Sequence, residues 1–157
     1  MNKKEVYTIE EVKRKLERYC VYQDRCHKEV EDKLGEYKLI PQAKEVILLH
    51  LLEHNFLNEE RFSKSFARGK YRIKKWGRLR IIRELKFRQI SEYNIRTALK
   101  EIDEKEYIQN LYSLVEKKNE LIKTTNAFER KKKLYDYLNY RGYESNLILE
   151  ALEVYTK

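Results

Sequence analysis

The sequence is poor in the residues that interrupt helices. Its 157 residues include one proline, Pro41, and four glycines. No stretch alternates apolar and polar residues convincingly with the period of two that a half-buried strand requires. Helix-favouring Lys, Glu, Leu and Arg dominate instead, and 41% of the residues are hydrophobic, which is enough for a packed core. Together these features predict an all-α protein.

Long apolar runs and cysteines are also scarce. The longest apolar run, residues 46–49, resumes after His50 for two residues, far short of the ~20 that a membrane span needs. The N-terminal lysines precede no apolar segment, so the pattern of a secretory signal is missing. Cys20 and Cys26 are the only cysteines, and nothing in their spacing demands a disulfide. We therefore expect a cytoplasmic protein with two reduced thiols and no membrane partner.

Helix-start and helix-stop residues divide the chain into nine expected helices. Thr8 and Glu11 form a capping box, Asn58 and Ser91 are typical N-cap residues, and Gly77 interrupts a helical pattern. These signals predict helices at about 8–23, 26–34, 41–52, 58–75, 78–88, 91–102, 103–118, 127–141 and 144–155, with a loop at 119–126.

The apolar pattern repeats along the chain. Leu85, Ile90, Ile95, Ala98 and Leu99 recur 53 residues later as Leu138, Tyr143, Ile148, Ala151 and Leu152, and a looser match relates residues 34–48 to 85–99. Chance agreement among amphipathic helices is the alternative, but the five-residue step across a helix–turn–helix junction favours true repeats. We predict three tandem three-helix units, at 1–57, 58–102 and 103–157, stacked into an elongated, curved body.

Positive charge is concentrated in the middle of the sequence. Residues 61–88 contain twelve Lys or Arg and one acid, Glu84, so this window carries +11 while the whole chain carries +9. A smaller basic cluster follows at residues 130–133. Such concentrated charge is typical of proteins that bind a polyanion.

Helical spacing predicts how these cations are displayed. Arg61, Lys64, Arg68, Arg72 and Lys75 would form one stripe, opposite a packing face of Phe62, Phe66, Gly69 and Ile73. In the next helix Leu79, Ile82 and Leu85 are expected to face inward. A face charged only for solubility is the alternative, but such faces normally mix in acids, and here nothing within the chain is expected to offset the repulsion. The predicted partner-binding residues are Arg61, Lys64, Arg68, Lys70, Arg72, Lys74, Lys75, Trp76, Arg78, Arg80, Arg83, Lys86, Arg88, Arg130, Lys131, Lys132 and Lys133.

The same segment carries a family resemblance. Residues 58–70 read NEERFSKSFARGK, and residues 76–85 read WGRLRIIREL. The first motif is similar to the central signature of the RecX family, and the second resembles the segment that follows it in that family. Residues 26–34, CHKEVEDKL, are similar to the first unit of the family, and residues 140–143, YRGY, to its last. Asn58, Ser63 and Gln89 depart from the usual Asp, Ala and Gly, each conservatively.

The resemblance implies a function as well as a fold. It implies three tandem three-helix units and a partner, the RecA recombinase assembled on single-stranded DNA, whose ATPase, strand exchange and filament growth the protein would inhibit or modulate. The curved, basic body would lie along the filament and meet DNA phosphates or acidic protein surface. Trp76 has two interpretations: it stacks on a base, or it caps the hydrophobic core.

Signals for an enzyme are weak. Residues 50–54, HLLEH, match the spacing of one metalloprotease class, and Cys20, Cys26 and His27 are metal-ligand types without a paired-cysteine motif. No nucleophile elbow and no glycine-rich phosphate loop occurs. We predict a non-enzymatic regulator that is monomeric and needs no cofactor or metal. A stand-alone DNA-binding protein, acting on single-stranded or double-stranded DNA, is the main alternative, and a zinc hydrolase is the third.

Overall fold

The computed structural model describes residues 6–155, and all regular secondary structure in this range is helical. The chain is therefore all-α, as its composition predicts. The described residues form nine helices and no strand: α1 (Ile9–Tyr22), α2 (His27–Leu34), α3 (Pro41–Glu53), α4 (Glu59–Arg72), α5 (Arg78–Phe87), α6 (Glu92–Leu99), α7 (Glu104–Leu121), α8 (Ala127–Tyr140) and α9 (Ser145–Tyr155).

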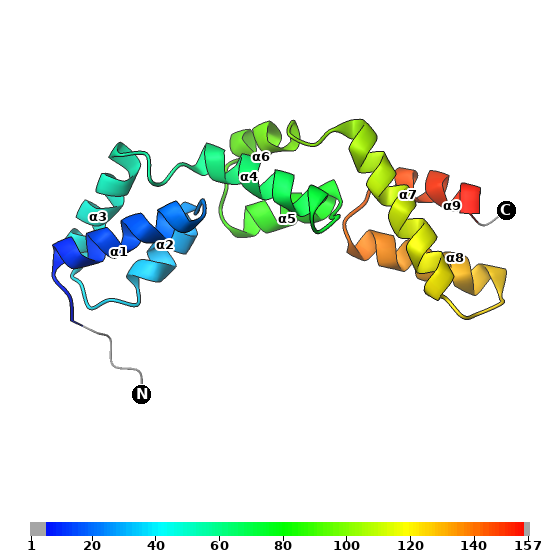
Figure 1. Cartoon of the computed structure of the whole chain (residues 1–157), viewed down its shortest axis with the longest axis horizontal. Helices are drawn as coiled ribbons and strands as arrows, with labels where there is room; N and C mark the ends of the chain where they lie inside the picture. Colours follow the sequence, from blue (N-terminus) through cyan, green and yellow to red (C-terminus); the bar gives the residue numbers. More distant parts are fainter. Residues whose placement is uncertain (1–5, 156–157) are drawn as a thin grey trace.

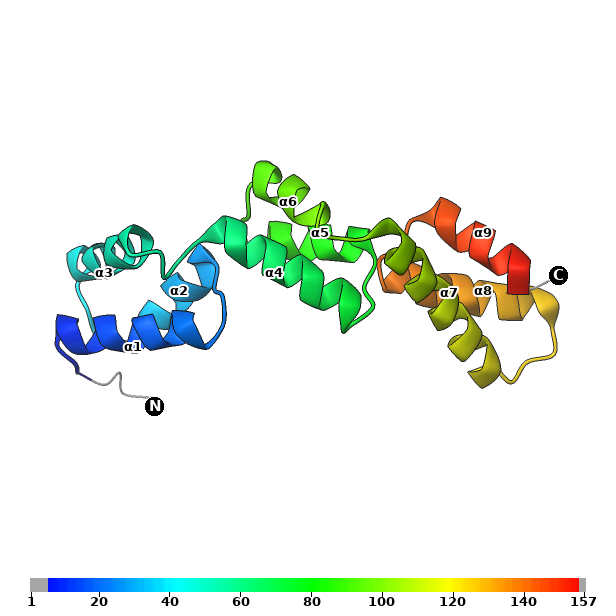
Figure 2. The same cartoon turned by 45° about the horizontal axis from the view of Figure 1, so that its top comes forward.

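The helices pack in three successive groups of three. Helix α1 contacts α2 and α3, α4 contacts α5 and α6, and α7, α8 and α9 contact one another. These groups, called here the first, middle and third bundles, lie in a row, so the molecule is elongated and arched (Figure 1 and Figure 2). The repeat architecture is confirmed in this respect. The exact unit boundaries at residues 57/58 and 102/103 stay a prediction.

Side-chain caps begin the helices where the sequence predicts them. The Thr8 hydroxyl accepts a hydrogen bond from the Glu11 amide, and the Glu11 carboxylate accepts one from the Thr8 amide, which completes the capping box. The side chains of Asn58, Ser91 and Asp103 each accept a bond from the amide three residues on. The starts of these four helices are therefore marked by side chains within a short stretch of sequence.

Three helices end in the same left-handed turn. Helices α3, α5 and α8 are followed by Asn55, Gln89 and Gly142, whose φ angles are 59°, 61° and 97°. In each case the next amide donates back to a carbonyl five residues earlier, as in a Schellman motif: Phe56 to Leu51, Ile90 to Leu85 and Tyr143 to Leu138. Gln89 and Gly142 are 53 residues apart, so the turn itself repeats with the period found in the apolar pattern.

The hydrophobic core is divided unequally among the bundles. The first bundle has its own core, in which Val12, Leu16, Ile47 and Leu51 are fully buried. The middle and third bundles share one continuous core that includes Tyr71, Leu85, Tyr107, Leu138 and Tyr143. The middle and third bundles are therefore joined by apolar packing as well as by polar contacts.

Backbone atoms of the middle and third bundles approach closely at one point. The Gly77 amide donates to the Arg141 carbonyl over 2.7 Å, and the Leu79 amide donates to the Gly142 carbonyl over 2.9 Å. A Cβ atom on Gly77 would lie 2.2 Å from the Gly142 carbonyl carbon, so only glycine fits. The loop after α4 is thus pinned to the turn between α8 and α9.

Several local expectations are wrong, and a tertiary contact accounts for one of them. Helix α4 ends at Arg72 rather than Lys75: Lys75 has a φ of 58°, and its carbonyl accepts a hydrogen bond from the Tyr143 hydroxyl over 2.8 Å. Helix α7 continues to Leu121, so the loop is 122–126 rather than 119–126.

Two apolar side chains assigned to packing faces are exposed instead. Ile73 is 78% exposed and Leu79 is 45% exposed. In their place α4 buries Ser63, Ala67 and Tyr71 beside Phe62, and α5 buries Ile81 and Leu85.

Candidate nucleic-acid interface

The cationic stripe on α4 is paired with acids of the protein itself. Arg61 lies 2.7 Å from a carboxylate oxygen of Asp24, and Lys64 lies 3.2 Å from Glu60 on the same helix. The expectation that nothing offsets repulsion along this stripe is therefore wrong at its N-terminal half.

The C-terminal half of the stripe is paired as well. Arg68 lies 3.0 Å from Glu101, just after α6, and Arg72 lies 3.8 Å from Glu106 on α7. Lys75 lies outside the helix and donates to the Asn110 side-chain oxygen over 3.1 Å. Asp24, Glu101 and Glu106 are distant in sequence, so helical spacing gave no sign of them.

Arg78 belongs to the junction between the middle and third bundles. Its guanidinium pairs with Glu104 and, over 2.6 Å, with Glu144. Burial disfavours the charged form, but the bond to Glu144 and the nearby carboxylates outweigh it and hold the Arg78 pKa above its ordinary value. Burial and a hydrogen bond to Glu144 likewise raise the pKa of Tyr107, which accepts a bond from the Arg78 amide. Arg78 therefore joins the bundles.

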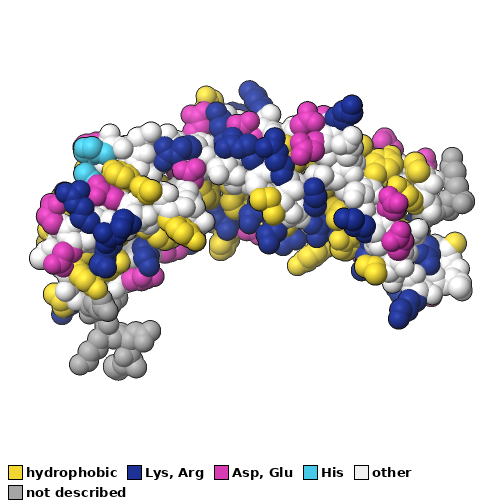
Figure 3. Space-filling model, viewed as in Figure 1, with side chains coloured by type: hydrophobic (Ala, Val, Ile, Leu, Met, Phe, Trp, Pro, Cys, Tyr) yellow, Lys and Arg dark blue, Asp and Glu magenta, His cyan; other side chains and the backbone are white. Residues whose placement is uncertain are grey.

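A second group of cations has no ion pair among residues 6–155. It consists of Lys70, Lys74, Arg80, Arg83 and Lys86, and we call it the unpaired basic face. Burial lowers the pKa of Lys70, and the neighbouring charges of Lys74, Arg88 and Arg80 lower it further, while the charge of Glu84 opposes them. Arg88 itself pairs with Glu84 over 2.9 Å. Figure 3 shows Lys and Arg side chains gathered over the middle bundle.

Trp76 organises part of this face. The Lys70 ammonium nitrogen lies 4.8 Å from the Trp76 ring centroid and the Arg80 guanidinium carbon 4.2 Å, both within cation–π range. The ring is half-buried and packs against the shared core, with Phe66 edge-on at 6.3 Å between centroids. Of the two interpretations of Trp76, the structure shows the core contact, and the ring also holds two cations in place.

The cluster at residues 130–133 is less available than its sequence indicates. Arg130 donates four hydrogen bonds at 2.7–2.9 Å, to the Asn119 carbonyl and side chain and to the carbonyls of Ile122 and Thr124. It therefore fastens the loop between α7 and α8. Lys132 pairs with Asp136 over 2.7 Å, while Lys131 and Lys133 are exposed and have no ion pair within the described part of the chain.

A groove of about 490 Å³ lies between α5 and α8, beside the unpaired basic face. Its lining residues are Arg80, Arg83 and Glu84 from α5 and Asp136, Asn139 and Tyr140 from α8. Asn139 and Tyr140 are absent from the residues predicted from the sequence. Tyr140 is 71% exposed, and only its position beside a basic helix of another bundle singles it out.

The residues that resemble metal ligands are engaged otherwise. His50 hydrogen-bonds Glu17 over 2.8 Å between α3 and α1, and the His54 ring contacts the His50 carbonyl. Within residues 6–155, no group of three or more His, Cys, Asp or Glu side chains is arranged to hold a metal ion. Cys20 and Cys26 are buried free thiols, and burial raises the pKa of each to about 11.

Comparison with known proteins identifies the family. The sequence model described as RecX, second three-helix domain, matches residues 58–99, and that of the RecX third three-helix domain matches residues 104–152. Together the two matches cover more than half of the chain. The chain belongs to the RecX family. Regulatory protein RecX of Lactobacillus gasseri is 28% identical over 143 residues, and the alignment covers 87% of this chain and 51% of that protein. Regulatory protein RecX of Bacillus cytotoxicus is 25% identical over 135 residues.

Solved RecX structures share the fold. A crystal structure of regulatory protein RecX superimposes with a TM-score of 0.83 at 19% identity, covering 92% of this chain and 73% of that one. The crystal structure of RecX from Lactobacillus salivarius superimposes with a TM-score of 0.77 at 21% identity, covering 93% of this chain and 95% of that one. The chain spans about half the length of the curated RecX proteins it matches. None of the described helices is long and apolar enough to cross a membrane.

Proposed function

We propose that this RecX-family protein is a non-enzymatic regulator of the RecA recombinase. In this proposal it binds RecA and RecA–single-stranded DNA filaments, and it inhibits or modulates their ATPase, strand exchange and growth during DNA repair and recombination. Family membership supports the choice of RecA. The elongated, arched body supports a partner that is itself extended. We further propose that the protein acts in the cytoplasm, as a monomer and without a cofactor.

The observation that carries the polyanion part of this proposal is the unpaired basic face. The stripe on α4 is a weaker candidate for the binding surface, because its cations are already paired with carboxylates of the protein. Lys70, Lys74, Arg80, Arg83 and Lys86 have no ion pair among residues 6–155, and their mutual repulsion favours the binding of an external anion. We therefore assign DNA phosphate or acidic RecA surface to this face, and a secondary contact to exposed Lys131 and Lys133.

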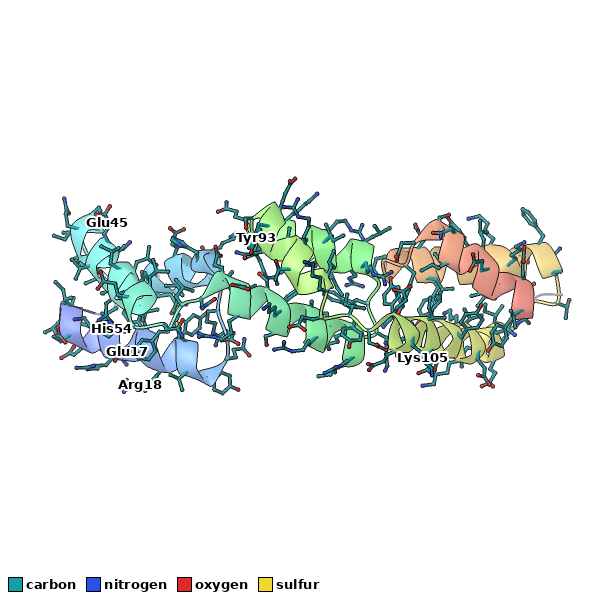
Figure 4. All side chains as sticks on the ribbon, turned by 90° about the horizontal axis from the view of Figure 1, so that it is seen from above. Glu17, Arg18, Glu45, His54, Tyr93 and Lys105 are labelled. Atoms are coloured by element: carbon teal, nitrogen blue, oxygen red, sulfur yellow. The ribbon has the colours of Figure 1, made fainter. Side chains whose placement is uncertain are left out.

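The test is the DNA-dependent ATPase activity of RecA. Substoichiometric wild-type protein should lower it. The triple variant Lys74→Glu, Arg83→Glu, Lys86→Glu should be a much weaker inhibitor. A matched control with the same charge change is Arg18→Glu, Lys105→Glu, Lys117→Glu. These three side chains are exposed on α1 and α7, and Figure 4 shows Arg18 and Lys105 along one long edge of the molecule. Unchanged ATPase at saturating wild-type protein would refute the proposal.

A stand-alone DNA-binding protein is the second candidate, because the unpaired basic face alone would support DNA binding. Competition separates the two functions. If the protein acts only by covering DNA, an excess of free DNA should abolish its effect on RecA. If it contacts the filament, inhibition should survive that excess.

A further inference from the structure

The groove between α5 and α8 is more positive than its composition indicates. Two of its six lining residues are acids, but both already have cationic partners four residues away along the chain. Glu84 pairs with Arg88 over 2.9 Å, and Asp136 pairs with Lys132 over 2.7 Å. The two arginines, Arg80 and Arg83, have no ion pair in the described structure. The groove therefore offers two guanidinium groups to an incoming anion.

One of these guanidinium groups is held in place before any ligand arrives. The Arg80 guanidinium carbon lies 4.2 Å from the centroid of the Trp76 ring and 5.1 Å from that of the Tyr140 ring. The Arg80 backbone is fixed too, because it lies against Gly142 at the junction of the middle and third bundles. A cation oriented in this way loses little freedom on binding, which favours tight contact with a phosphate.

The same groove exposes an aromatic ring beside that phosphate site. Tyr140 is 71% exposed, although it contacts Arg80. Exposed aromatic rings next to arginines are how many proteins hold the bases of single strands. Asn139, the neighbour of Tyr140, supplies a side-chain amide able to donate to and accept from a base edge. The volume of about 490 Å³ lies in the range of small-ligand sites.

We propose that this groove is a subsite for one nucleotide of a single strand. Arg80 and Arg83 contact its phosphate, and Tyr140 stacks on its base. A duplex is a poor fit, because its bases are already stacked and paired. The subsite rests on the proposed function, since it specifies how the unpaired basic face meets single-stranded nucleic acid.

The experiment compares two labelled strands with equal numbers of phosphates, an oligo-dT and an abasic strand, by fluorescence anisotropy at low salt. Tyr140→Ala should weaken binding of oligo-dT by about 5- to 160-fold, the effect expected for loss of one stacked base. It should leave the affinity for the abasic strand unchanged. Tyr140→Phe, which keeps the ring, should bind like the wild type. Tyr93→Ala is the matched control: Tyr93 is 65% exposed and lies on α6 (Figure 4), whereas the groove is lined by residues of α5 and α8.

Each contrary outcome has a distinct meaning. If Tyr140→Ala binds both strands as the wild type does, the groove is not a subsite, while the proposed function stands. Equal weakening on both strands would show that Tyr140 acts only by positioning Arg80, and it would overturn the stacking claim. A polyglutamate peptide can also be used to displace oligo-dT from the protein. If it displaces oligo-dT equally well from the wild type and from Tyr140→Ala, the groove is a site for an acidic protein instead. Failure of the wild type to bind either strand would overturn the subsite and the DNA contact of the proposed function together.

Discussion

Replacing Gly142 by alanine should destabilise the protein, because two physical costs coincide at this position. The residue has a φ of 97°, which an L-residue adopts at a cost of roughly 1–2 kcal/mol. Its Cβ would also lie 2.4 Å from the Arg80 Cβ and 2.5 Å from the Arg80 nitrogen. Since the obstructing atoms include backbone, the two chain segments must separate.

Separation of the two segments would lengthen or break the hydrogen bonds that join the bundles there. The bonds from the Gly77 amide to Arg141 and from the Leu79 amide to Gly142 are each worth about 0.5–1.5 kcal/mol net. Adding the loss of both bonds to the conformational cost, we expect Gly142→Ala to lower the free energy of unfolding by about 2–5 kcal/mol. The assay is urea unfolding followed by the fluorescence of Trp76, the single tryptophan, which is next to Gly77.

Gly69→Ala is the matched control, because it is the same substitution in a different environment. Gly69 lies inside α4, and apart from its chain neighbours and the backbone of that helix no heavy atom lies within 4 Å of the position its Cβ would take. Alanine there should raise the free energy of unfolding by about 0.5–1 kcal/mol through helix propensity. A loss below about 1 kcal/mol for Gly142→Ala, or equal effects of the two substitutions, would refute this account of the junction.

Three further predictions concern single features of the fold. Gln89→Gly should stabilise the protein by about 0.5–1 kcal/mol in urea unfolding, because φ at this position is 61°; destabilisation would contradict it. Arg130→Ala should lower the free energy of unfolding by about 1–3 kcal/mol, because four acceptors lose their donor. The affinity for DNA in an anisotropy titration should stay nearly unchanged, and a large loss of affinity would show that Arg130 is a binding residue. Cys20 and Cys26, with pKa values of about 11, should react with iodoacetamide at pH 8 about 100-fold more slowly than a free thiol until urea is added. Rapid labelling of the native protein would contradict the burial of these thiols. Because their folded-state pKa values lie above the unfolded ones, the contribution of the thiols to the free energy of unfolding is complete below pH 9 and is lost as the pH rises towards 11.

Local chemistry explains why much of the fold was predictable. Caps such as Thr8 and Asn58 act on amides three residues away, so their effect is written in a short stretch of sequence. The apolar repeat was visible for the same reason, because it depends on helical spacing within each unit. Even the left-handed turn at Gln89 is consistent with sequence, since it replaces the glycine usual in the RecX family.

The candidate site was harder to predict, because long-range contacts decide which cations are available. Arg68 and Arg83 look equivalent in the sequence, yet Glu101 pairs with Arg68 and no acid of the described segment pairs with Arg83. The same limitation applies to Arg130, whose acceptors include the Asn119 carbonyl eleven residues before it. The groove was missed because Tyr140 comes beside α5 only when the third bundle packs against the middle one.

The central claim is that the unpaired basic face, rather than the paired stripe on α4, meets the polyanion. The most direct test is the salt dependence of binding to single-stranded DNA, where each phosphate contact contributes about 0.7 to the slope of log K against log salt. The variant Lys74→Gln, Arg83→Gln, Lys86→Gln should reduce the magnitude of the slope by about 2. The double variant Arg68→Gln, Glu101→Gln, which removes a whole ion pair, should leave the slope unchanged. A smaller slope in the ion-pair variant, with no change in the triple variant, would contradict the claim.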